Sequence, residues 1–175
     1  MVIRKLILLW ATVVFLVGCG SAVKHIQMSE SLYEKTPYFF VLDEVTVSVD
    51  RQTRHLPVAV IPVLVKSYLE KELESTGHSL SESGSGARTV GVKVDITGFR
   101  DRGSFNRWIW GPFSGGDFIE SNVILIDQKT GEKLGVLKVR SEYAWVGGME
   151  DVAKIHSRKI ASLLNEISTG DIHSS

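Results

Sequence analysis

Residues 89–99 read TVGVKVDITGF and show the most regular alternation in the chain. Apolar and polar side chains would point to opposite faces of a strand. The apolar set is Val90, Val92, Val94 and Ile96, and the polar set is Lys93, Asp95 and Thr97. Such alternation favours a sheet with one face buried beneath helices and the other face in contact with water.

Three further strands and two helices are predicted around this stretch. Alternating residues predict strands at 38–49 and 133–146, and a further strand is predicted at 117–127, where it ends in the apolar run 123–126. Apolar residues at helical spacing predict helices within 57–77 and 150–167. A turn over 127–132 would place Gly131 at positive φ. We therefore expect an α+β fold of order β-α-β-β-β-α. It would be a two-layer sandwich, with two helices on one face of a mainly antiparallel four-stranded sheet.

The N-terminus has the parts of an export signal. Two basic residues precede an apolar run at 6–17, and this run is shorter than the roughly 20 residues that a membrane-spanning helix needs. The sequence Leu16-Val17-Gly18-Cys19 then reads as a lipobox, with Leu16 and Gly18 recognised by the signal peptidase. Cys19 is the only cysteine, so no disulfide competes for its thiol. We predict that Cys19 carries the lipid anchor, with acyl chains such as palmitate.

This signal divides the chain into a signal peptide at 1–18, a lipidated tether at 19–37, a periplasmic α+β domain at 38–168 and a frayed C-terminus at 169–175. Gly20 stands where an aspartate would retain a lipoprotein in the inner membrane. We therefore expect the outer membrane, with the domain facing the periplasm. The outer leaflet of the inner membrane is the alternative.

The composition gives no sign of catalysis. No Gly-x-Ser-x-Gly or Walker sequence is present, and the five histidines are too scattered to indicate a metal site. His156 falls beside the apolar stripe of the last predicted helix, where a surface or half-buried position is expected. We predict no catalytic residues, no metal, no cofactor and no enzymatic activity. The balance of 20 basic and 20 acidic residues gives no indication of nucleic-acid binding.

Residues 100–116 read RDRGSFNRWIWGPFSGG and form the best candidate for an interaction loop. Large aromatic side chains are costly to expose, and aromatics and arginine dominate protein interfaces. The candidate residues are Arg100, Arg102, Arg107, Trp108, Trp110 and Phe113. The aromatics could bind a protein, cover the edge or far face of the sheet, or enter the membrane interface. A long tether would make the membrane contact unnecessary.

The second half of the chain resembles a family of bacterial lipoproteins known as domain of unknown function 4410. The resemblance rests on the strand end ITGFR at 96–100, the loop end FSGG at 113–116, the turn DQKTGE at 127–132, and a Gly-Gly break before the last helix. It implies no catalytic residues. We expect a non-enzymatic lipoprotein that acts as an interaction or accessory module for an envelope protein. The alternative is a periplasmic module that binds a small ligand or glycan between Tyr143, Trp145 and the loop aromatics.

Overall fold

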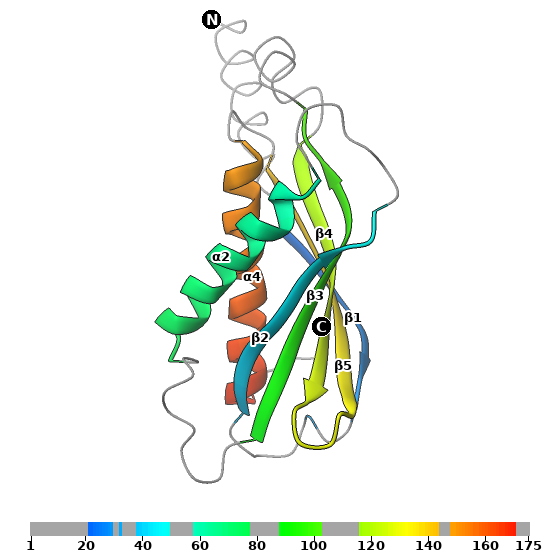
Figure 1. Cartoon of the computed structure of the whole chain (residues 1–175), viewed down its shortest axis with the longest axis vertical. Coiled ribbons are helices and arrows are strands. Elements are labelled where there is room, and N and C mark those ends of the chain that lie inside the picture. The colour runs from blue at the N-terminus through cyan, green and yellow to red at the C-terminus, as the bar shows by residue number, and fades with distance from the viewer. Residues whose placement is uncertain are drawn as a thin grey trace, which may run out of the picture.

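The computed structural model describes residues 21–29, 32, 38–49, 58–77, 88–102, 116–143 and 148–170. They form five strands and two helices (Figure 1). The strands are β1 (Ser21–Met28), β2 (Tyr38–Val47), β3 (Arg88–Arg100), β4 (Asp117–Asp127) and β5 (Lys133–Tyr143). The helices are α2 (Val60–Ser75) and α4 (Met149–Thr169).

The strands form one sheet in the order β1-β5-β4-β3-β2. Every neighbouring pair is antiparallel except β2 and β3, which are parallel. Both helices lie on the same side of this sheet (Figure 1). The predicted α+β class, the mainly antiparallel sheet and the order β-α-β-β-β-α are confirmed for residues 38–169.

The sheet also has a strand that was not predicted. Residues 21–28, expected as part of a tether, form β1 and pair with β5 along its free edge. The physical reason is that an edge strand offers unpaired backbone N–H and C=O groups, and pairing with them requires no regular side-chain pattern. The prediction of a tether was wrong for these residues.

The core fills the space between the sheet and the two helices. The predicted inward face of β3 is buried, as are Ile61, Val65, Leu69 and Leu73 on α2. On β4 every second residue from Asp117 to Asp127 is buried, so alternate side chains point toward the helices. Most of the apolar stripe of α4 is buried as well. Burial of this apolar surface is the main force that holds the two layers together.

The turn between β4 and β5 forms as predicted, with Gly131 at φ 73°. The Asp127 carboxylate accepts hydrogen bonds from the backbone N–H groups of Lys129, at 2.7 Å, and Thr130, at 2.8 Å, and pairs with Arg88. The Thr130 N–H and the Arg88 guanidinium lower the pKa of Asp127 to about 2. The charged carboxylate therefore stabilises this turn.

Candidate interaction site at one end of the sheet

One end of the sheet carries a dense polar network. Here β3 ends, β4 begins and β5 ends, with Arg100 opposite Phe118 and Asp117 opposite Tyr143. We call it the Arg102 end, and its members are Arg100, Arg102, Gly116, Asp117, Phe118, Glu120, Arg140 and Glu142. The segment 103–115 leaves the described chain after Arg102 and rejoins it at Gly116. This network therefore surrounds both ends of the predicted interaction loop.

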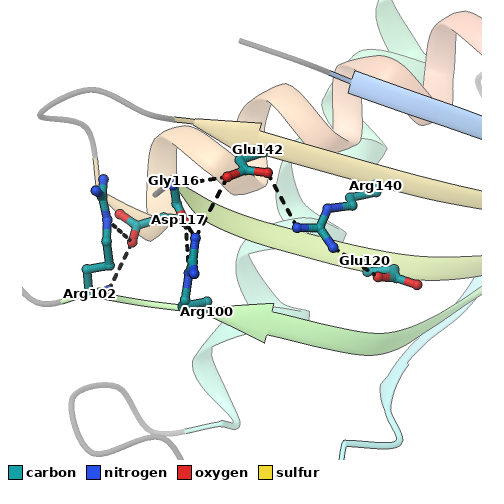
Figure 2. Close-up of polar contacts among 7 residues, drawn as sticks. All are labelled: Arg100, Arg102, Gly116, Asp117, Glu120, Arg140 and Glu142. Carbon is teal, nitrogen blue, oxygen red and sulfur yellow. Dashed lines mark hydrogen bonds and ion pairs between the residues drawn. The ribbon is translucent and has the colours of Figure 1, made fainter. Parts of the chain in front are cut away.

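Gly116 is held on both sides of its backbone (Figure 2). Its carbonyl accepts hydrogen bonds from Arg100, with Nε at 2.9 Å and Nη2 as a second donor. Its N–H donates to Glu142 Oε1 at 3.0 Å. A Cβ at position 116 would lie 2.5 Å from Glu142 Cγ, so this approach requires glycine. The point where the segment rejoins the sheet is therefore held closely.

The other end of the segment is held by Arg102. Asp117 Oδ1 accepts hydrogen bonds from the Arg102 backbone N–H at 2.9 Å and from its Nε at 3.1 Å (Figure 2). Asp117 has no exposed surface and Arg102 is 8% exposed. A buried ion pair is costly to break because the remaining charge has little access to water. The pair joins the residue that precedes the segment to the residue that follows Gly116.

Further charges continue the network along the outer face of the sheet. Arg140 lies between two carboxylates, with Nη1 3.6 Å from Glu120 and Nη2 3.4 Å from Glu142. The guanidinium groups of Arg100 and Arg140 lie 5.4 Å and 4.2 Å from the centroid of the Phe118 ring. Cations over an aromatic face attract it electrostatically. The arginines at this end therefore attract both the carboxylates and the aromatic ring of Phe118.

The structure brings two of the six predicted loop residues into this network. Arg100 holds Gly116, and Arg102 is buried against Asp117, so both position the segment. Arg107, Trp108, Trp110 and Phe113 lie outside the described residues. So do Leu16, Gly18 and Cys19 of the lipobox.

The acidic half of the network could not be recognised from the sequence. Asp117, Glu120 and Glu142 had no recognisable context, because their partners lie on other strands and meet them only through the register of the sheet. One signal was present. Glu120 on one strand, and Arg140 and Glu142 on the next, occupy alternate positions that a sheet would place on its outer face.

A second polar cluster lies inside the core. His156 on α4 has Nε2 2.8 Å from the Ser121 hydroxyl and Nδ1 3.1 Å from the Ser141 hydroxyl. All three side chains have no exposed surface, so the expected surface or half-buried position of His156 was wrong. Desolvation lowers the pKa of His156 to about 3, which keeps the ring neutral.

A serine beside a histidine also occurs as the nucleophile and base of hydrolases. Here the burial of all three side chains closes the cluster to substrate, and its role is to satisfy polar groups between α4 and the sheet. Within the described ranges, no three His, Cys, Asp or Glu side chains gather as metal ligands. In the same ranges, no helix has the length and apolar character needed to cross a membrane.

Several solved structures are similar to this chain. A PelC dodecamer from Paraburkholderia phytofirmans is 14% identical, with 83% of this chain and 97% of that chain covered and a TM-score of 0.49. A candidate lipoprotein from Caulobacter crescentus CB15 is 13% identical, with coverage of 70% and 88% and a TM-score of 0.39. A DUF330 protein from Xanthomonas campestris is 11% identical, with coverage of 78% and 90% and a TM-score of 0.49. These likenesses are too low to carry an argument about function.

Comparison of the sequence with functionally curated proteins found no match. A family model does match, over residues 50–147 and thus over more than half of the chain. The matched region runs from the residues before α2 to the end of β5 and contains the whole Arg102 end of the sheet. The chain therefore belongs to the family described as domain of unknown function DUF4410.

Proposed function

We propose that this protein is a lipid-anchored lipoprotein of the bacterial outer membrane, with its α+β domain facing the periplasm. The support is the sequence Leu16-Val17-Gly18-Cys19 behind a short apolar run and two basic residues. Lipid on Cys19 would hold the domain at the membrane without a membrane-spanning helix.

The domain would serve as a non-enzymatic accessory module. The observation that carries this proposal is the network at the Arg102 end, which holds both ends of segment 103–115. Arg102 and Asp117 are bonded to each other, and Glu142 holds the Gly116 N–H, so these polar groups support the segment. A segment with fixed ends and four large aromatic residues suits binding, because less conformational freedom is lost on contact.

Crosslinking in intact cells tests the accessory role. A photo-reactive residue at Arg107 should capture other envelope components, and the Trp108→Ala/Trp110→Ala variant should lose that capture while keeping its thermal unfolding temperature. Lys129→Ala is the matched control, because it changes an exposed turn residue at the opposite end of the sheet. Unchanged capture by the folded double variant would contradict the proposed role of the segment.

A further inference from the structure

A row of charged side chains crosses the open face of the sheet at the Arg102 end. Both helices lie on the other face of the sheet (Figure 1). The register places Glu120 on β4 directly opposite Arg140 on β5, and alternate residues of a strand share a face. We call the set the charged row, and its members are Arg100 on β3, Glu120 on β4, and Lys138, Arg140 and Glu142 on β5.

The cations of the charged row reach further into water than its carboxylates do. The side chains of Lys138, Arg140 and Arg100 are 43%, 42% and 44% exposed. Those of Glu120 and Glu142 are 21% and 35% exposed. Three cations also stand against two carboxylates. The surface that an approaching molecule would meet here is therefore basic.

The carboxylates of the charged row already have cationic partners. Glu120 Oε1 lies 2.6 Å from Lys138 Nζ, and its Oε2 lies 3.6 Å from Arg140 Nη1. Glu142 Oε1 lies 3.7 Å from Arg100 Nη2, and its Oε2 lies 3.4 Å from Arg140 Nη2. Lysine has three N–H donors and arginine has five. Among the described residues, these contacts use only part of the donors of Lys138 and Arg140, so the row suits a ligand that brings further anionic acceptors.

Arg140 is also held in one place. Its guanidinium lies between the carboxylates of Glu120 and Glu142 (Figure 2) and 4.2 Å from the centroid of the Phe118 ring. A side chain that is ordered before binding loses less conformational freedom when a ligand arrives. Its remaining N–H groups are therefore in position to bind a carboxylate.

The spacing of the two outermost cations fits an extended peptide. Lys138 and Arg140 are two residues apart on β5, which separates their side chains by about 7 Å. Alternate side chains of any extended chain have the same spacing. Two carboxylates at alternate positions of an extended peptide would therefore meet Lys138 and Arg140 together.

We propose that Lys138 and Arg140 bind carboxylates of an acidic, extended segment of the envelope protein that this module contacts. The inference rests on the proposed accessory role and adds the chemistry of the partner. The charged row lies beside the fixed ends of segment 103–115, so one partner can contact both. Complementary charge across the contact would favour this partner over basic proteins.

Peptide binding tests the proposal. The full mature protein, purified in non-ionic detergent, is titrated against a dye-labelled peptide of alternating glutamate and threonine, and fluorescence anisotropy gives the Kd. We expect the peptide to bind, and Lys138→Gln to raise its Kd about fivefold through the loss of one exposed charge pair. Lys138→Arg, which keeps the charge, should bind as the native protein does. Added salt should weaken binding, because it screens exposed charges.

Lys93→Gln is the matched control. Lys93 also lies on the open face, is 45% exposed and pairs with a glutamate on the neighbouring strand, Glu44, at 4.0 Å. It is not part of the charged row, so the Kd of this variant should equal that of the native protein. A peptide that does not bind, or that binds native and Lys138→Gln proteins equally, would overturn the proposal.

Two further measurements separate the alternatives. Alginate, an anionic glycan, is titrated in the same way, and Lys138-dependent binding of alginate without binding of the peptide would overturn the protein partner. In cells, Lys138→Gln should lower the capture from a photo-reactive residue at Arg107. Absence of capture by the native protein contradicts the proposed function, whereas undiminished capture by Lys138→Gln contradicts only the carboxylate contact.

Discussion

Arg102 and Asp117 form a buried ion pair at the point where the chain leaves β3 and enters β4, with Arg102 Nε 3.1 Å from Asp117 Oδ1. The same carboxylate oxygen accepts the Arg102 backbone N–H. One carboxylate thus fixes both the main chain and the side chain of a residue 15 positions earlier. Because the pair joins the two ends of segment 103–115, it connects the stability of the sheet to the geometry of the candidate site.

Replacing one member of this pair should be strongly destabilising. We expect Asp117→Ala or Arg102→Ala to lower the free energy of unfolding by about 3 kcal/mol or more, because the remaining charge is left buried. The double variant should lose less free energy of unfolding than the two single variants lose in total, because it leaves no unpaired charge in the interior. Urea unfolding of all four proteins measures this coupling. Additive losses would show that the two side chains do not stabilise the domain as a pair.

The buried His156 should make stability depend on pH. In the unfolded chain the histidine binds a proton near pH 6.5, whereas burial lowers its pKa in the folded state to about 3. Between these values the unfolded state holds more protons, so stability falls as the pH falls. The loss should reach up to about 1.4 kcal/mol per pH unit.

The His156→Gln variant isolates this effect. Its stability should change much less between pH 6.5 and pH 4, whereas Asp127, whose folded pKa is also lowered, acts only below about pH 4 in both proteins. Urea unfolding at several pH values gives the comparison. Parallel pH profiles for the native protein and the variant would contradict the burial of a neutral histidine.

Gly116 should not tolerate a side chain. In Gly116→Ala the new Cβ would meet Glu142 Cγ at 2.5 Å and the Tyr143 carbonyl oxygen at 2.9 Å. We expect a loss of about 1–3 kcal/mol in the free energy of unfolding. Gly98→Ala is the matched control on the same sheet, since its Cβ would have its nearest contacts at 3.6 Å. Equal losses of unfolding free energy in the two variants would show that the close approach of Glu142 and Tyr143 to Gly116 is not the cause of the loss.

The sequence predicts the layers of this fold well and its long-range contacts poorly. The alternation at Val90–Ile96 and the helical spacing on α2 were sufficient, because burial against a second layer imposes these patterns directly. Strand β1 needs no regular side-chain pattern, because it is held by backbone hydrogen bonds to the edge of the sheet at β5. The Arg102–Asp117 pair and the His156 cluster depend on the register between strands and on helix packing, which no local pattern encodes.

The predicted site could be derived from the sequence only in part. The arginines and aromatic residues mark segment 100–116 as unusual. The residue type alone does not distinguish Arg100 and Arg102, which hold the segment, from an arginine that is available for binding. That distinction came from Glu142 and Asp117, which reach Arg100 and Arg102 from neighbouring positions in the sheet.

The modification of Cys19 is the most direct test of the account. Cells that express the protein are supplied with a labelled fatty acid, and the mature protein is analysed by intact mass. We predict that the mature chain begins at Cys19 and carries the label, and that Cys19→Ser accumulates as an unlabelled precursor that retains residues 1–18. A native protein without the label, or a Cys19→Ser variant processed as the native protein is, would contradict the lipid anchor.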